Sequence, residues 1–403
     1  MYNGYFGNII DIISDQASWE AFFDYKKDNQ HLSKYEEASI RNFITQKRYL
    51  PLCDNIRDNS FPGENPVKLL VNKQGATKKR IVYSFSQDVN FMLKFIAHQL
   101  YKYDDHFENS CYAFRKNYGV GNAFTRIRSL HNSRNLSSKY CLKVDISNYF
   151  NSIDVEILLN KLSFVDDPVI LNIFKAILTN DVVLYNNVPV SDNHGAMAGL
   201  PISPFCANVY LSETDKLFND MNVIYFRYSD DILLFADTMD ELLKYQDILY
   251  SNLTTLKLSV NPDKEHIYQP GEVWEFLGFS FDNGIIDLSE NTKKKIKAKI
   301  KRKANALMRW QRKKKLPRER AAIGFINSMN RKFFGTDEDD EFTWSRWFFP
   351  ILNTEKGLAE IDHYMQQYIR YIITGRHYKG NYRIRYEQIK KWGYRSLVNE
   401  YYK

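Results

Sequence analysis

The most constraining feature of the sequence is a pair of apolar runs, VIYFRY and DILLFA, that meet at a short polar turn within residues 223–236. Runs of this length, rich in aromatic and β-branched residues, predict the two strands of a β-hairpin. Asp230 and Asp231 lie side by side at the turn, although adjacent carboxylates repel each other and lose solvation among apolar neighbours. A polar turn without chemistry is one explanation, and a site that uses the concentrated negative charge is the other.

A second predicted strand, KYCLKVDI at 139–146, offers a partner for that charge. Its aliphatic residues alternate with Cys141, Lys143 and Asp145, so Asp145 faces away from the aliphatic set near the end of the strand. If Asp145 lies beside the turn, three carboxylates converge. Mg²⁺ prefers such oxygen ligands, and two Mg²⁺ ions, with Mn²⁺ as an alternative, can activate a hydroxyl and stabilise leaving pyrophosphate.

The remaining pattern mixes strands with helices. Residues 66–85 predict a hairpin whose turn is QGAT, and residues 1–60 are helix-like without recognisable chemistry. Ser203 and Pro204 predict a helix start, as N-cap and first helical residue. This order favours an α+β fold with an antiparallel sheet covered by helices on one face, followed by an all-helical C-terminal region.

The basic charge is concentrated in one stretch. The chain has a net charge of +8, but residues 293–320 alone hold fifteen Lys or Arg and one Glu. Ile296, Ile300, Ala304, Leu307 and Met308 form an apolar stripe on the predicted helix, which leaves a lysine-rich remainder. Lys299, Arg302 and Lys303 belong to that remainder. A nucleic-acid backbone is the expected partner, against a solvated helix face or a membrane-surface helix, whose large aromatic anchors the stripe lacks.

The cysteines and the N-terminus narrow the setting. Four scattered cysteines without a CxxC pair predict neither a zinc site nor a disulfide scaffold. The first twenty residues carry acidic positions in their apolar part, unlike a signal peptide, and no run approaches the roughly 20 apolar residues of a membrane span. We therefore expect a cytoplasmic protein that does not act at a membrane.

Five stretches in order, KVDISNYFNSI, GLPISPFCANVYL, FRYSDDILLF, NPDKEHI and WEFLGFSF, resemble the successive motifs of reverse transcriptases. The resemblance covers roughly residues 65–285. It implies a right-hand polymerase with a helical N-terminal extension at 1–64, fingers at 65–140, a palm at 141–285, and a helical thumb with a C-terminal extension at 286–403.

The resemblance also implies roles for the acidic residues. Asp145, Asp230 and Asp231 would hold two metal ions, with the carbonyl group of Ile146 as a further ligand. Phe150 falls where the family keeps an aromatic ring under the sugar, and a bulky ring there leaves no space for a 2′-hydroxyl. A core phenylalanine is the alternative reading of Phe150.

Basic residues are assigned to the nucleotide by the same resemblance. Lys73 and Arg80 flank the turn of the first hairpin, where the family holds the incoming triphosphate, and fixed cations there would neutralise charge that shifts toward pyrophosphate. Lys264 would donate a proton to that pyrophosphate. The alternatives are a solvated basic hairpin and an exposed lysine.

Other motif residues are assigned to template and primer. Tyr112, Phe114 and Arg115 resemble a segment that lines the template path, with a buried aromatic pair as the alternative. Ser203 and Pro204 belong to the motif that contacts template and nucleotide.

The chain departs from the family where many members have Pro-Gln-Gly and this sequence has Met197, Ala198 and Gly199. A glutamine that could hydrogen-bond near the template is missing, while Gly199 still permits close backbone approach to the substrate. This form, with the RYSDD hairpin and the C-terminal stretches SRWFFPI and GYRSLVNEYY, resembles bacterial unknown-group and abortive-infection reverse transcriptases, many of which act in phage defence.

We therefore expect RNA-templated DNA synthesis, with an RNA template, such as a dedicated non-coding RNA, deoxynucleotides and a DNA product. A homo-oligomer or an accessory protein is a further expected partner. Two alternatives stay open: a template-independent or protein-primed DNA polymerase, and an inactive nucleic-acid-binding scaffold.

Overall fold

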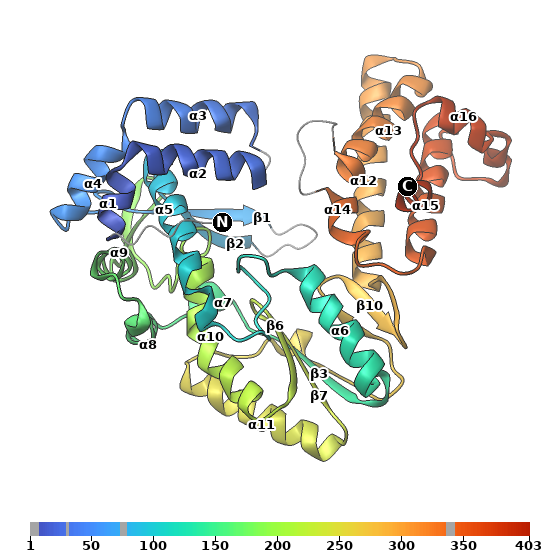
Figure 1. The fold of residues 1–403 in the computed structure, drawn as a ribbon. Coiled ribbons are helices and arrows are strands. Elements are labelled where there is room, and N and C mark those ends of the chain that lie inside the picture. The colour runs from blue at the N-terminus through green and yellow to red at the C-terminus, as the bar shows by residue number, and fades with distance from the viewer. Residues whose placement is uncertain (1–7, 30–31, 73–78, 336–342) are drawn as a thin grey trace. The chain divides into compact units, whose positions relative to one another are not determined.

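The structure is a computed structural model that describes residues 8–29, 32–72, 79–335 and 343–403. The chain divides into two compact units, residues 1–270 and 271–403 (Figure 1). The predicted α+β class with antiparallel sheets is confirmed. The turn of the first predicted hairpin and Lys73, which flanks it, lie outside the described residues.

The first unit begins with four helices that pack near α5 (Gln87–Gln99): α1 (Ile9–Ser14), α2 (Gln16–Asn29), α3 (Lys34–Thr45) and α4 (Tyr49–Arg57). Ser33 and Glu36 form a capping box that starts α3, because each side chain accepts from the backbone N–H of the other. The buried ring of Trp19 lies edge-on to Phe95 of α5, with 4.5 Å between ring centres. This N-terminal segment is thus part of the core of the first unit.

A small sheet has the order β2-β1-β4-β5: β1 (Val67–Asn72), β2 (Lys79–Ser84), β4 (Val182–Tyr185) and β5 (Val188–Ser191). β1 and β2 pair antiparallel as predicted, from Val67 opposite Ser84 to Asn72 opposite Lys79. β4 joins β1 in parallel.

The second sheet has the order β6-β7-β3-β8 and is fully antiparallel: β3 (Tyr140–Asp145), β6 (Ile224–Tyr228), β7 (Asp231–Ala236) and β8 (His266–Tyr268). The predicted hairpin is confirmed. Four consecutive residues of β7, from Ile232 to Phe235, are buried. Because successive side chains of a strand point to opposite faces, both faces are covered, and the expectation of one covered face was wrong.

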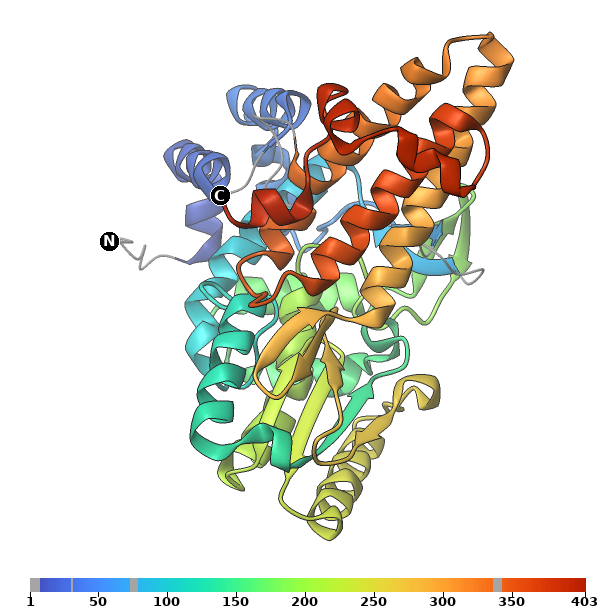
Figure 2. The ribbon, with the colours of Figure 1, turned by 90° about the vertical axis from the view of Figure 1, so that its right-hand side faces the viewer.

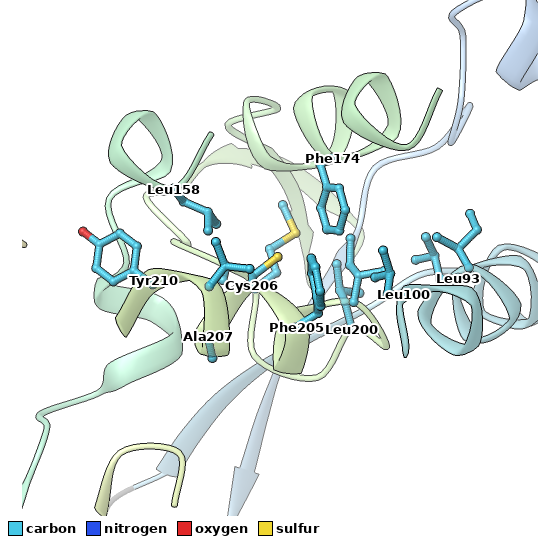
Figure 3. Close-up of a cluster of buried hydrophobic side chains, with 14 of the residues drawn as sticks. Leu93, Leu100, Leu158, Phe174, Leu200, Phe205, Cys206, Ala207 and Tyr210 are labelled. Carbon is cyan, nitrogen blue, oxygen red and sulfur yellow. The ribbon is translucent and has the colours of Figure 1, made fainter. Parts of the chain in front are cut away.

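Helices cover this sheet. α10 (Ser203–Asp220) contacts β6, and α11 (Met239–Thr255) contacts β7 and β3. The other face meets the segment that precedes α6 (Val120–Arg134), where Tyr112 stacks on Phe226 of β6. Figure 3 shows the buried side chains around α10, among them Phe205, Cys206 and Tyr210. The shorter helices of this unit are η1 (Leu100–His106), η2 (Leu136–Ser138), α7 (Tyr149–Ser152), α8 (Val155–Lys161), η3 (Leu162–Phe164), α9 (Pro168–Leu178) and η4 (Pro262–Lys264).

The second unit combines the sheet β11-β10-β9 with helices (Figure 2). Its elements are β9 (Trp274–Phe276), β10 (Phe279–Asp282), β11 (Ile285–Leu288), α12 (Glu290–Lys314), α13 (Arg318–Phe334), α14 (Trp344–Phe348), α15 (Lys356–Thr374), η5 (Lys379–Arg383), α16 (Tyr386–Lys391) and α17 (Leu397–Tyr401). Leu307 of the predicted stripe on α12 is half-buried. The other four residues of the stripe are buried: Ile296, Ile300, Ala304 and Met308. This stripe packs α12 against α13 and α15.

All four cysteines are buried and free. None of the helices in the described ranges is long and apolar enough to cross a membrane.

Candidate active site

A tight turn carries the two adjacent aspartates. Tyr228 pairs with Asp231, so Ser229 and Asp230 alone connect β6 to β7. Ser229 has a φ of 61°, in the left-handed region that a two-residue hairpin turn requires. The turn therefore projects Asp230 from the end of the hairpin, next to Asp231 on the first position of β7.

The third aspartate reaches the same place through strand register. Asp145, the last residue of β3, lies directly opposite Asp231 of β7. The backbone N–H of Ile146 donates to the carbonyl oxygen of Asp230 at 3.1 Å, and Ile146 forms a β-bridge with Val260. These contacts hold the end of β3 against the hairpin turn.

Burial makes this acidic group electrostatically costly. Burial raises the pKa of Asp231 to about 6; the Lys143 ammonium opposes this rise, and the carboxylates of Asp230 and Asp145 add to it. Burial also raises the pKa of Asp230, again together with Asp145, whereas Lys264 and Arg80 lower it. A positively charged group that approaches these residues therefore stabilises the ionised form of the carboxyl groups.

One such cation is already present. The Nζ of Lys264 donates to Oδ2 of the buried Asp145 at 2.5 Å. Lys264 belongs to the short helix η4, whose position is set by the N–H of Asn261 donating to the carbonyl oxygen of Asp145 at 2.8 Å. The predicted nucleotide-binding lysine thus lies at the acidic group.

The donor set fits a divalent cation. Within the four described ranges, no group of three or more His, Cys, Asp or Glu side chains forms a ready-made metal site, and Lys264 contacts Asp145. The carboxylates of Asp145, Asp230 and Asp231 nevertheless meet at one end of the sheet, and their repulsion and burial are relieved by positive charge. These oxygen ligands are the type that Mg²⁺ prefers.

An aromatic pair includes Phe150, which follows Asp145 by five positions in the chain. Phe150 is half-buried just beyond β3, and its ring centre lies 6.0 Å from that of Phe114 in a T-shaped arrangement. Phe114 is 41% exposed and has a φ of 59°. The backbone of Phe150 is fixed by Ala196, whose N–H donates to its carbonyl oxygen at 2.8 Å.

The loop that departs from the family pattern packs against the small sheet. Tyr83 of β2 donates its N–H to the carbonyl oxygen of Ala198 at 2.8 Å, and Asn151 accepts from the N–H of Ala198 at 3.0 Å. Gly199 has a φ of 112°, and a Cβ there would lie 2.8 Å from the carbonyl oxygen of Tyr83. The close approach that requires glycine at this position is thus to β2, and the expected approach of Gly199 to the substrate stays a prediction.

Ser203 does not cap α10 as predicted. The cap position is Ile202, and the buried Ser203 hydroxyl lies 2.6 Å from the carbonyl oxygen of Ala196 and 2.7 Å from that of Met197. The hydroxyl therefore ties the preceding loop to the helix, because those carbonyl groups need donors. Pro204 follows in the first turn and is half-buried.

Two of the three predicted template-path residues are used inside the protein. Arg115 is buried and donates to the carbonyl oxygens of Asp104, Glu108 and Cys111. Tyr112 is buried against Phe226. Tyr112 is thus packed in an aromatic pair, the alternative given above, and Arg115 is held by three backbone carbonyl groups, whereas the exposed Phe114 stays a predicted contact.

The remaining predicted contacts are basic. Arg80 is exposed on β2 and helps to lower the pKa of Asp230. Arg302 and Lys303 are exposed on α12, where Lys299 is half-buried. Burial, and then the neighbouring cations Lys332, Arg302 and Lys295, lower the pKa of Lys299, as expected for a cluster of like charges.

Arg227 lies beneath the turn and was not among the predicted site residues. Its side chain is 0% exposed, and its Nη1 donates to the carbonyl oxygen of Ser229 at 3.3 Å. The signal was an arginine within the otherwise apolar run VIYFRY, because a charge is rarely buried without a specific partner.

The order of these elements along the chain can be compared with known proteins. The family described as reverse transcriptase (RNA-dependent DNA polymerase) matches residues 71–281, which contain the hairpin, the three aspartates and Lys264. The chain belongs to the reverse transcriptase family. The predicted family and enzyme class are thereby confirmed.

One reverse transcriptase and two solved structures are among the proteins to which this chain is similar. The chain is 24% identical to the Retron Ec86 reverse transcriptase of Escherichia coli over 284 residues, which cover 65% of this chain and 82% of that protein. A truncated apo telomerase of Candida tropicalis is 15% identical, with a TM-score of 0.44; the match covers 56% of this chain and 55% of that one. Telomerase of Candida albicans in complex with a fragment of telomeric RNA is 12% identical, with a TM-score of 0.45, over 89% of this chain and 70% of that one.

Proposed function

We propose that this reverse transcriptase copies an RNA template into DNA by nucleotidyl transfer at Asp145, Asp230 and Asp231. The observation that carries the proposal is the register that sets Asp145 opposite Asp231 beside the Asp230 turn. Two Mg²⁺ ions, or Mn²⁺ in their place, would be held by these carboxylates and the Ile146 carbonyl group, and would supply charge that activates the primer hydroxyl and stabilises pyrophosphate.

In the reaction, the primer 3′-oxygen forms a bond to the α-phosphorus of the deoxynucleotide while the bond to the bridging oxygen breaks. Arg80 and the predicted Lys73 balance charge on the phosphates. Lys264 supplies a proton to the leaving pyrophosphate, and the hydroxyl proton passes to solvent. Phe150 lies under the sugar and excludes a 2′-hydroxyl. Phe114, Ser203, Pro204, Lys299, Arg302 and Lys303 remain proposed contacts of template and primer.

The test is synthesis by the purified full chain on a primed RNA template with four deoxynucleotides and Mg²⁺ or Mn²⁺. The Asp230→Ala, Asp231→Ala double variant is the control for activity, and its unfolding curve checks that it is folded. We expect DNA complementary to the template from the wild type and none from the variant. Absence of incorporation by folded wild type on primed, co-purified and unprimed nucleic acid would reject the proposal.

A second candidate function is synthesis without a copied template or from a protein primer. The observation that favours it is Ala198, whose methyl group stands where many members of the family have a glutamine. Sequencing the DNA decides between the two, because a defined complement of one RNA supports copying and a homopolymer or random sequence supports untemplated synthesis.

We further propose a role in bacterial defence against phage, which rests on the resemblance to unknown-group and abortive-infection reverse transcriptases. Cells that carry the wild-type chain should survive phage infection better than cells that carry Asp230→Ala. Equal protection by the variant would favour the inactive scaffold, since a scaffold does not need the carboxylate.

A further inference from the structure

A basic and aromatic segment of the second unit lies beyond the region matched by the family. Residues 376–385, RHYKGNYRIR, contain four cations and no acidic residue, whereas the match ends at residue 281. All four cationic side chains are exposed: Arg376, Lys379, Arg383 and Arg385. The ring of Tyr382 between them is 59% exposed.

The backbone of this segment is held from below. Arg370 of α15 is buried, donates its Nε–H to the carbonyl oxygen of Ile384 at 2.9 Å, and places its guanidinium 5.3 Å from the centre of the Tyr382 ring. The buried Asn381 donates from Nδ2 to the carbonyl oxygen of Arg376 at 2.9 Å. The outward side chains are therefore presented by an anchored turn.

Further rings lie beside the cations. The ring of His377 stacks on Tyr371 of α15 at 4.0 Å with 6° between the planes. The guanidinium of Arg376 lies 4.5 Å from the centre of the Tyr378 ring. Arginine planes and aromatic faces of this kind are what unstacked bases bind.

The charge of the segment is not balanced locally. On α12, Lys293 and Lys297 form ion pairs with Glu360 of α15. In the part of the chain that the structure describes, no carboxylate forms an ion pair with the four cations of residues 376–385. Arg318 of α13 is also exposed, and it donates to the carbonyl oxygen of Ile373 at 3.2 Å, three residues before the segment. It therefore adds a fifth cation beside the four.

We propose that residues 376–385, together with Arg318, bind single-stranded RNA. The exposed cations would contact successive phosphates, and the Tyr382 ring would stack on a base. A lipid surface is less suited, because Ile384, the large aliphatic residue of the described segment 376–385, is buried and cannot anchor in it. The inference rests on the proposed function in one respect, that RNA is the expected partner.

The test measures binding of a fluorescent single-stranded RNA of about 12 nucleotides to the full chain, without deoxynucleotides or metal. Tyr382→Ala removes the exposed ring and keeps the charge, and Arg376→Ala with Arg383→Ala removes two cations. The matched control is Lys390→Ala with Lys391→Ala, an equal charge change on two exposed residues of α16. An RNA duplex and anionic lipid vesicles serve as alternative ligands.

We expect Tyr382→Ala to weaken single-strand binding by about 5-fold or more and to leave duplex binding unchanged. The double arginine variant should weaken binding and reduce its salt dependence by about two counter-ions, beyond the effect of the lysine control. Single-strand binding by Tyr382→Ala equal to that of wild type would overturn the proposal, as would arginine and lysine variants of equal effect, or tighter binding to vesicles than to RNA.

Synthesis on a short, pre-annealed primer and template is measured in the same variants. It should stay near the wild-type rate, because the acidic residues and Lys264 are untouched. Loss of single-strand binding with synthesis intact supports the inference, whereas a wild-type chain that binds RNA through Tyr382 and makes no DNA would reject only the proposed function.

Discussion

Arg227 and Asp215 form a bidentate ion pair that is fully buried beneath the turn carrying Asp230. The Nε and Nη2 of Arg227 donate to the two carboxylate oxygens of Asp215 at 2.7 and 2.5 Å, and Tyr225 also donates to Asp215. Because Nη1 of the same guanidinium donates to the carbonyl oxygen of Ser229, the pair connects α10 to the β6–β7 hairpin.

Arg227→Met should lower the free energy of unfolding by about 3–5 kcal/mol, because it leaves the Asp215 carboxylate buried without its cation. The double variant Arg227→Met, Asp215→Leu should lose less, because neither charge remains. Urea unfolding measures both, with the exposed Arg134→Met as the control. A loss in the double variant equal to or above that of the single variant would contradict this account.

Phe150→Ala should admit ribonucleotides, because it removes the ring that we propose excludes the 2′-hydroxyl. We expect the ratio of kcat/KM for deoxynucleotide over ribonucleotide to fall by about 10-fold or more. Tyr35→Ala, on the surface of α3, is the matched control. An unchanged ratio would assign Phe150 to the core instead.

Gly199→Ala should destabilise the protein by about 1–3 kcal/mol, because alanine at a φ of 112° is strained and its Cβ would press on the Tyr83 carbonyl oxygen. Gly121→Ala in α6 is the opposite case, since nothing lies within 4 Å of a Cβ there and helix propensity improves. Thermal unfolding should therefore shift down for Gly199→Ala and not for Gly121→Ala.

His98 should make the protein less stable in acid. Burial, with help from the cations Lys116 and Lys26, lowers the pKa of His98 from 6.5 to about 4. Between these values the unfolded chain binds the proton and the folded chain does not, so this contribution to stability is complete above pH 6.5 and is lost as the pH falls toward 4. His98→Gln should show a weaker loss of urea stability than wild type over this interval, and an equal loss would refute the assignment.

Added Mg²⁺ should raise the thermal unfolding midpoint of the wild type, because an ion bound only by the folded chain stabilises that chain. At a hundredfold excess over Kd, the free energy of unfolding should rise by about 2.7 kcal/mol. Asp230→Asn should remove most of this shift and Asp247→Asn, on the surface of α11, should not. The readout does not depend on synthesis. Equal shifts in all three proteins would place the ion elsewhere.

Local sequence patterns predicted much of this fold. The strand at 140–146 was predicted from a period of 2 residues, the two strands around Ser229 and Asp230 from their apolar runs, and the stripe of α12 from a period of 3.6 residues; the structure has each of these elements. The period of 3.6 residues succeeds for α12 because this helix buries one stripe, whereas β7 is buried on both faces and was recognised by its continuous apolar run. Ordered motifs also identified the family, which the match over residues 71–281 confirms.

Tertiary structure decided what each polar group contacts. Lys264 forms an ion pair with Asp145, which lies 119 positions away in the sequence. Ser203 donates to carbonyl groups of the preceding loop, and the guanidinium of Arg115 donates to three carbonyl groups. Strands β1, β2, β3, β6 and β7, the basic helix and the acidic turn could be predicted from the amino-acid sequence, because these depend on neighbours along the chain. The sequence could not determine those partners, because a buried donor or acceptor is satisfied by whichever group the packed elements bring within about 3 Å, however distant in sequence.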